Sequence, residues 1–219
     1  MHGLQDIVQG VGKKDKMPVL SIHKCEKDIM VHKFDAKKAE ILDSIDRRKF
    51  LNPDSILKKA GIDSDTVLAD LGCGSGYFTI PASFIVKKVY AIDVQQEMLD
   101  IIGEKIRTGK IKNIETILSK ESSIPLPDKS VDVLFMANVF HELDDRGGIL
   151  KEAKRILSGR GRMIIIDWKK IEMEFGPPVG ERLTAEEVVS ICEKGGFTML
   201  ERLEAGEYNY MLVFGKSAT

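Results

Sequence analysis

An acidic residue followed by three alternating glycines is the most informative pattern in the sequence. It reads Asp70-x-Gly72-x-Gly74-x-Gly76 and begins at the end of the apolar run Val67–Leu71. Glycines let the backbone turn sharply and approach a ligand closely, and a helix beginning just after them would direct its positive dipole end at an anionic group. We therefore expect a nucleotide-type ligand at this loop.

The spacing of the glycines argues against a dinucleotide. A GxGxxG fingerprint needs a third glycine where Tyr77 or Thr79 stands. Asp70 would also repel a pyrophosphate, whereas it suits a cation. A ligand that combines an ammonium or sulfonium group with a carboxylate fits both the acid and the helix terminus, and S-adenosylmethionine is such a ligand. A purely structural tight turn is the alternative interpretation.

A second acid, Asp93, follows the next apolar run, residues 88–92. A carboxylate at this position of a doubly wound sheet can accept hydrogen bonds from the two hydroxyls of a ribose. The alternative is a solvated aspartate at a strand end.

Short β-rich runs alternate with helix-period segments from residue 67 onward, a pattern typical of right-handed βαβ units in a parallel sheet. The expected strands are 67–71, 88–92, 114–118, 131–136 and 163–167, and the expected helices run from about Ser75 and over 95–106, 147–157 and 185–194. Runs 197–203 and 208–214 are joined by so short a link that only an antiparallel hairpin is allowed. Segments 36–48 and 53–61 predict a helical cap within residues 31–62, and residues 1–30 predict a flexible N-terminal arm ahead of the 31–219 domain.

Composition excludes several classes of protein. The chain has 219 residues, 43% of them hydrophobic and 31% charged, and a net charge of -1, as expected of one ordinary domain. Balanced charge argues against nucleic acid as a partner, and no uncharged apolar run approaches the ~20 residues of a membrane span. The three dispersed cysteines, Cys25, Cys73 and Cys192, fit neither a disulfide framework nor a zinc site. We therefore expect no metal and a cytoplasmic location.

These motifs together resemble class I S-adenosylmethionine-dependent methyltransferases. The resemblance rests on the acid and glycine loop, on Asp93, and on the run Ile124-Pro125-Leu126-Pro127-Asp128-x-Ser130-x-Asp132, which is similar to the branch that includes ubiquinone/menaquinone-biosynthesis-type methyltransferases. It covers roughly residues 34–216. It implies a Rossmann-like α/β fold with a seven-stranded sheet, mostly parallel with an antiparallel last strand, with helices on both faces and a short N-terminal helical cap.

The resemblance also implies where the cofactor lies. The acid and the glycines would hold the methionine portion, Asp93 the ribose, and residues 119–123 the adenine. The expected cofactor-binding residues are Asp70, Gly72, Gly74, Gly76, Asp93, Val94, Met98, Lys120, Glu121, Ser122 and Asn138. Lys120, followed by Glu121, stands where this branch often has an adenine-contacting aspartate. Met98 is a candidate for the purine face, with ordinary core packing as the alternative.

Methyl transfer needs a base only where the acceptor must lose a proton, because the product S-adenosylhomocysteine leaves as a neutral sulfide. His141, just after the strand 131–136, is the candidate general base because its unperturbed pKa lies near neutrality. Asp167, at the end of the strand 163–167, is the second catalytic candidate. Alternatives are packing or cofactor contact for His141 and a helix or loop cap for Asp167.

The function predicted from the sequence is methyl transfer from S-adenosylmethionine to a small-molecule acceptor. Residues 31–34 and the link 169–184 would shape the acceptor pocket. A homodimer is one possible assembly. A catalytically silent methyltransferase-like binding subunit is the alternative, and a nicotinamide-dependent oxidoreductase is disfavoured by the failed glycine spacing.

Overall fold

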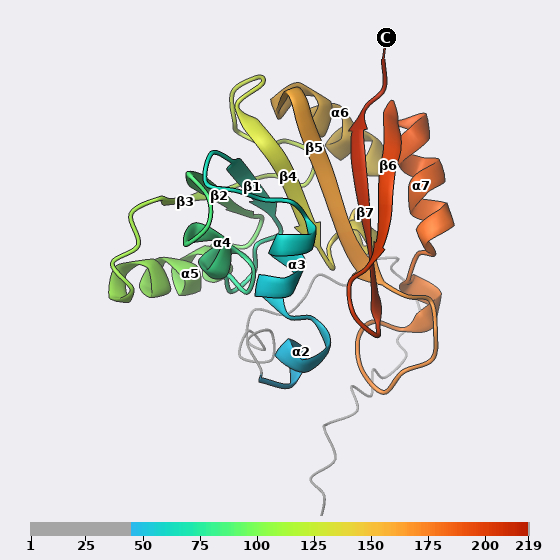
Figure 1. Cartoon of the computed structure of the whole chain (residues 1–219), viewed down its shortest axis with the longest axis horizontal. Helices are drawn as coiled ribbons and strands as arrows, with labels where there is room; N and C mark the ends of the chain where they lie inside the picture. The colour runs from blue at the N-terminus through green and yellow to red at the C-terminus, as the bar shows by residue number, and fades with distance from the viewer. Residues whose placement is uncertain (1–44, 219) are drawn as a thin grey trace, which may run out of the picture.

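A seven-stranded sheet forms the centre of the molecule (Figure 1). The structure, a computed structural model, describes residues 45–218, so the predicted arm 1–30 and the first part of the predicted cap lie outside the described residues. The strand order is β3-β2-β1-β4-β5-β7-β6. The strands are β1 (Val67–Leu71), β2 (Lys88–Asp93), β3 (Ile114–Leu118), β4 (Val131–Ala137), β5 (Leu157–Trp168), β6 (Phe197–Glu204) and β7 (Asn209–Lys216).

The strand directions confirm the predicted fold class. Neighbouring strands from β3 to β5 pair in parallel, and β7 is antiparallel to both β5 and β6. The four residues between β6 and β7 are too few for a parallel crossover, so β7 enters the sheet as the second strand of a hairpin. The last strand therefore lies inside the sheet, and β6 forms its edge.

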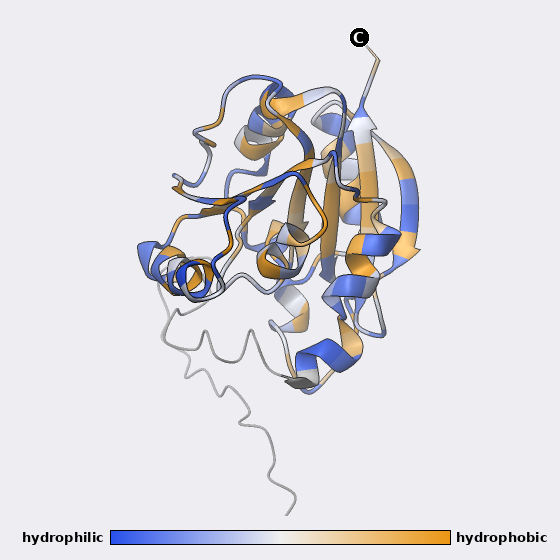
Figure 2. Ribbon diagram, turned by 60° about the vertical axis from the view of Figure 1, so that its left-hand side comes forward, coloured by the Kyte–Doolittle hydropathy of each residue, from blue (hydrophilic) through white to orange (hydrophobic). Residues whose placement is uncertain are grey.

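Helices cover both faces of the sheet because the parallel strands are apolar on both sides. In β4, Val133 and Phe135 pack toward α3 (Pro53–Lys59) and α4 (Thr79–Ser83), while Leu134 and Met136 pack toward α6 (Arg146–Ile156) and α7 (Ala185–Lys194). The helix α5 (Gln96–Thr108) covers Ala91 of β2 through Leu99 and Ile102. Figure 2 shows the resulting apolar strands inside and hydrophilic outer faces on the helices.

Three elements differ from the sequence-based expectations. The helix expected from about Ser75 begins at Thr79, and β5 begins at Leu157, immediately after α6, rather than at residue 163. In the cap, the described helix is α2 (Ile45–Phe50), whereas the predicted segment 36–48 lies mostly outside the described residues. Two short 3-10 helices, η2 (Phe140–Glu142) and η3 (Val179–Glu181), follow β4 and β5 along the chain.

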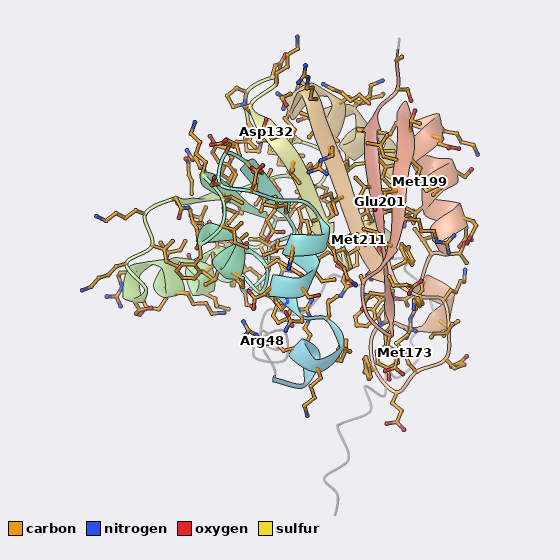
Figure 3. The ribbon with its side chains drawn as sticks, viewed as in Figure 1. Arg48, Asp132, Met173, Met199, Glu201 and Met211 are labelled. Atoms are coloured by element: carbon orange, nitrogen blue, oxygen red, sulfur yellow. The ribbon has the colours of Figure 1, made fainter. Side chains whose placement is uncertain are left out.

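The carboxyl ends of β1, β2, β4 and β5 meet at one edge of the sheet because these strands are parallel. Arg48 of α2 and Met173 of the link after β5 lie at this end of the molecule, and Asp132 lies at the opposite end (Figure 3). Asp132 accepts hydrogen bonds from the Val67 amide (3.0 Å) and the Ser158 hydroxyl (3.1 Å). Asp132, the last residue of the motif 124–132, therefore connects the starts of β1 and β5 and is not part of a site at the carboxyl edge.

Candidate functional site

The glycine loop turns away from β1 with its backbone in conformations that favour glycine. Gly72, Gly74 and Gly76 have φ values of 72°, 52° and 89°. A Cβ atom on Gly72 would lie 2.4 Å from Cγ2 of Val139, in the segment after β4, and one on Gly76 would lie 2.8 Å from Cδ1 of Ile102. Glycine is therefore required here both by backbone conformation and by close packing.

The same conformations explain why α4 begins late. A right-handed helix cannot continue through residues with positive φ, so helical geometry starts only at Thr79, after the last glycine. The helix α4 has five residues. The expected contribution of a helix dipole at the loop is consequently small, and the nearby acids have the larger electrostatic role.

Asp93 holds the glycine loop against the end of β2. One carboxylate oxygen accepts from the Gly74 amide and the other from the Gln95 amide, each at 2.9 Å. The amides of Gly72 and Cys73 donate to the Ile92 carbonyl at 2.8 and 3.0 Å. The structure thus brings Asp93 and the glycines together, as the sequence spacing predicts.

Asp70 is a buried acid without an ion-pair partner. It is 2% exposed, its Oδ2 accepts from the Thr79 hydroxyl at 2.5 Å, and no cation among residues 45–218 forms an ion pair with it. Burial, with a smaller contribution from the charge of Asp93, raises the pKa of Asp70 to about 7 against the opposing effects of the Thr79 hydrogen bond and the charge of Arg47. A buried carboxylate that lacks a cationic partner fits an ammonium or sulfonium ligand. The residues present therefore fit S-adenosylmethionine.

The segment after β3 presents one buried polar side chain and several exposed ones. Ser119 donates its amide to the Asp93 carbonyl at 2.9 Å, and its buried hydroxyl has no hydrogen-bond partner. Lys120, Glu121 and Ser122, which the sequence singled out, are exposed. The predicted adenine segment 119–123 includes Ser119, which contacts the Asp93 backbone, but the individual site residues chosen from it are its exposed neighbours.

Val94 and Met98, two further residues expected to bind the cofactor, lie in contrasting environments. Val94 follows Asp93 and is 36% exposed, so a ligand at this edge can reach it. Met98 is 2% exposed on the inner side of α5. Its burial agrees with core packing, the alternative considered for Met98 in the sequence.

His141 and Asp167 form a hydrogen-bonded pair. Nδ1 of His141 lies 2.7 Å from Oδ1 of Asp167, and the two side chains are 4% and 1% exposed. Asp167 also accepts from the His141 amide (3.0 Å) and the Trp168 amide (2.9 Å). Burial lowers the pKa of His141, but the hydrogen bond and charge of Asp167 outweigh it, with a contribution from Glu142, and the net shift is upward.

Glu142 is a residue that sequence reasoning did not select. Its Oε1 lies 3.7 Å from Nε2 of His141, and its side chain is 28% exposed. Burial raises the pKa of Glu142 to about 7; the charge of His141 opposes this, and those of Asp167, Asp93 and Glu181 add to it. Its position directly after His141 in the chain was the only available signal.

Asn138 begins the turn after β4 and pairs with an unexpected partner. Its φ is 59°, and its Oδ1 accepts from Nδ2 of Asn209, at the start of β7, at 2.8 Å. Nδ2 of Asn138 and Oδ1 of Asn209 are buried without hydrogen-bond partners. Reversing both amides would again leave one donor and one acceptor unpaired, so the pair offers a complementary donor and acceptor in either orientation. Sequence reasoning missed Asn209.

The link 169–184 is gathered around Arg182. This side chain is 2% exposed, and its guanidinium donates to four carbonyls of the link, those of Pro177 (2.8 Å), Ile171 (2.7 Å), Phe175 (3.1 Å) and Lys169 (3.4 Å). The ring of Phe175 stacks on Phe50 of α2 and meets Tyr208 edge to face, with centroids 4.9 and 4.8 Å apart.

The aromatic contact joins the link to α2 and the β6–β7 turn at the carboxyl edge. Residues 31–34, the other segment expected to shape the pocket, lie outside the described residues.

Between residues 45 and 218 there is no group of three or more His, Cys, Asp or Glu side chains that could hold a metal ion. No helix in that part of the chain is both long enough and apolar enough to cross a membrane. Cys73 and Cys192 are buried free thiols, and Cys25 lies outside the described residues.

A parallel sheet with an inserted antiparallel last strand, a glycine loop after β1 and acids at the ends of β1 and β2 define an S-adenosylmethionine-dependent methyltransferase. Residues 69–165 match the family described as Methyltransferase domain. The structure is similar to that of a SAM-dependent methyltransferase from Aquifex aeolicus, with 38% identity, coverage of 83% of this chain and 98% of that one, and a TM-score of 0.80. This chain belongs to the S-adenosylmethionine-dependent methyltransferases.

A relative in the predicted branch also matches. The ubiquinone/menaquinone biosynthesis C-methyltransferase UbiE of Escherichia coli is 27% identical over 115 residues, which are 51% of this chain and 46% of that protein. The chain spans less than half the length of the curated relatives it matches. The resemblance to the ubiquinone/menaquinone branch is thereby confirmed at the level of family.

Proposed function

We propose that this protein transfers a methyl group from S-adenosylmethionine to a small-molecule acceptor in the cytoplasm. The observation that carries the proposal is Asp70, a buried carboxylate with no ion-pair partner among residues 45–218, beside a glycine loop at the carboxyl edge of the sheet. Ligand binding at this edge is the rule in open α/β folds. When bound, S-adenosylmethionine supplies a methyl group activated by a sulfonium centre.

The cofactor assignments follow the geometry of the loop. Asp70 would hold the cationic part of the methionine portion. Asp93, which already fixes the loop, would accept from the ribose hydroxyls. Ser119 is the strongest candidate for a hydrogen bond to the adenine, because its buried hydroxyl has no hydrogen-bond partner in the part of the chain that the structure describes.

His141 is the proposed general base, and Asp167 its orienting partner. Asp167 accepts three hydrogen bonds and is almost fully buried, so it is better placed to orient His141 than to meet an acceptor itself. With Nδ1 bound to Asp167, the Nε2 atom of the neutral imidazole is the one that can accept a proton.

The acceptor side of the site combines polar and aromatic groups. The Asn138–Asn209 pair supplies an unpaired donor and an unpaired acceptor, and the link held by Arg182 brings Phe175 to the same edge. A small acceptor with a hydroxyl, amide or similar group would satisfy both orphan atoms of the asparagine pair.

Ligand-dependent thermal melting tests the cofactor assignment. S-adenosylmethionine and S-adenosylhomocysteine should each raise the melting temperature, corresponding to about 2.7 kcal/mol at one hundred times the dissociation constant, and NAD should not. The variant Asp70→Asn should lose most of this rise, whereas Asp144→Asn, an exposed acid in the turn before α6, should keep it. An absence of any rise with both sulfur compounds would contradict the proposal.

Methyl transfer itself is tested with an isotopically labelled donor and a small-molecule cell extract. Mass identification of the labelled compound would name the acceptor. Binding of the donor without transfer to any extract component would instead support the catalytically silent subunit.

A further inference from the structure

When the acceptor atom carries a hydrogen, the proposed reaction releases a proton in a buried site, and this proton has to reach solvent. Attack by an acceptor atom X on the methyl carbon forms an X–C bond and breaks the C–S bond, whose electron pair stays on sulfur. If X carried a hydrogen, that proton passes to a base. His141 and Asp167 are 4% and 1% exposed, so this pair has almost no direct contact with water.

Glu142 provides the missing connection between the pair and solvent. Its Oε1 lies 3.7 Å from Nε2 of His141, and its side chain is far more exposed than either member of the pair. The separation is an ion-pair distance but longer than a hydrogen bond. Nε2 is therefore not committed to Glu142 and can first meet a proton on the acceptor.

The surroundings of Glu142 also favour proton uptake by this residue. The carboxylates of Asp167, Asp93 and Glu181 all act against its negative charge, and His141 is the cation that offsets it. Arg146 faces the same segment, but its guanidinium donates to the carbonyls of Phe140 (3.0 Å) and His141 (2.7 Å). The raised pKa of Glu142, about 7, agrees with a group that binds and releases a proton near neutrality.

We propose that Glu142 is a positioning residue that acts through His141, holding the imidazolium and then receiving its proton for release to solvent. The inference rests on the proposed function, because it takes His141 as the base. In the full step, Nε2 of neutral His141 takes the proton from X–H, and Nδ1–H stays bound to Asp167. The Glu142 carboxylate then takes the Nε2 proton and passes it to water, which returns both groups to their starting forms.

Titration of His141 by NMR tests the coupling without any activity. The ring signals of His141 are assigned by their loss in His141→Asn, and titrations are run on the wild type, Glu142→Gln and the exposed control Glu193→Gln of α7. A unit charge about 4 Å away in water contributes about 1 kcal/mol, so the pKa of His141 should fall by about 0.7 or more in Glu142→Gln and stay unchanged in Glu193→Gln. An unchanged His141 pKa in Glu142→Gln would overturn the proposal.

Labelled methyl transfer then tests the role in turnover. Glu142→Gln should be at least about tenfold slower than the wild type at pH 7, with a changed pH–rate profile and an unchanged affinity for S-adenosylmethionine. Glu142→Asp, which keeps the carboxylate, should recover part of the rate. Equal rates and profiles in wild type and Glu142→Gln defeat only this inference. A wild type that transfers no methyl group defeats the proposed function, and this inference with it.

Discussion

At the scale of single residues, the site contains two acids whose neighbours stabilise the negative charge less than burial destabilises it. Asp70 and Glu142 both have pKa values raised to about 7, and burial is the first cause in each case. A buried carboxylate of this kind lowers the free energy of unfolding, and the same environment favours its binding of a cation or a proton. The arrangement is what a cationic methyl donor requires.

This cost gives a prediction for Asp70→Asn. Between the unfolded value of 3.8 and the folded value of about 7, the folded protein holds a proton that the unfolded chain has lost, so stability falls as pH rises through this window. The contribution is fully present below pH 3.8 and lost above about pH 7. At pH 8 the asparagine variant, without added cofactor, should therefore be more stable than wild type by about 1–4 kcal/mol, or several degrees in melting temperature.

Melting curves from pH 4 to pH 8 check the sign. The difference between Asp70→Asn and wild type should shrink toward pH 4, and the control Asp144→Asn should show no such trend. A variant that is less stable than wild type at pH 8 would contradict the account of Asp70.

Residues adjacent in sequence were predictable, and pairs brought together by the sheet were not. The spacing from Asp70 to Gly76 and the position of Asp93 predicted that this loop and this acid lie together, and the structure places them in contact. The sequence proposed His141 and Asp167 separately, but their contact depends on the parallel register of β4 and β5, in which Ala137 lies opposite Ile166. Asn209 reaches Asn138 only because β7 is inserted next to β5.

At the scale of elements, the backbone conformation of the glycine loop separates the end of β1 at Leu71 from the start of α4 at Thr79. The apolar runs located the strands well, because a buried parallel strand is apolar on both faces. The start of α4 was misplaced because positive φ values at Gly74 and Gly76 cannot be read from helix periodicity. The early start of β5 comes from the pairing of Leu157 with Val131 of β4, which local composition does not reveal.

Alanine substitutions at two glycines separate the requirement for glycine from a general effect of alanine. Gly72→Ala should destabilise the protein by about 2 kcal/mol or more and weaken cofactor binding, because of its φ of 72° and the clash with Val139. Gly103→Ala, inside α5 with open space at its Cβ, should stabilise by about 0.5–1 kcal/mol. Urea unfolding measures both, and a neutral Gly72→Ala would refute the packing argument.

Arg182 should not be replaceable by lysine. Its guanidinium donates to four carbonyls, and an ammonium group cannot reproduce that planar geometry. We expect Arg182→Lys to lose about 2–4 kcal/mol, since four partly buried carbonyls lose their common donor. Limited proteolysis should cut within residues 169–181 in this variant. As a control, Arg160→Lys, at an exposed position of β5, should behave as wild type.

At the scale of the whole molecule, the two halves of the sheet have different tasks. The strands β1, β2 and β3 end at the proposed cofactor groups. The strands β4 and β5 end near His141 and at Asp167, and the antiparallel strand β7 begins at Asn209 on the same edge. Alternation of strands and helices predicted this layered sheet, and the short hairpin link predicted its antiparallel strand. Because β1 pairs with β4 in the sheet, the half with the proposed cofactor groups lies next to the half with His141 and Asp167.

Hydrogen exchange should distinguish the two halves. Adding S-adenosylhomocysteine should slow amide exchange in residues 72–79 and 119–123, because a ligand there restricts local opening. Exchange in residues 169–184 should change little until an acceptor is present. Protection confined to the link would place the cofactor on the wrong half and contradict the assignment.

The link 169–184 is held by the guanidinium of Arg182, and this arrangement affects how the choice of acceptor can change among related proteins. Arg182 binds backbone oxygens, which are the same in every amino acid. Apart from Phe175, which packs on Phe50 and Tyr208, and Gly176, whose φ is 86°, the side chains of residues 169–181 can therefore vary without loss of these hydrogen bonds. Chimeras that import this stretch from a relative should therefore acquire a new choice of acceptor while keeping the same methyl source. On the proposed assignment, the glycine loop binds the methyl donor, and the link 169–184, held by Arg182, contributes to recognition of the acceptor.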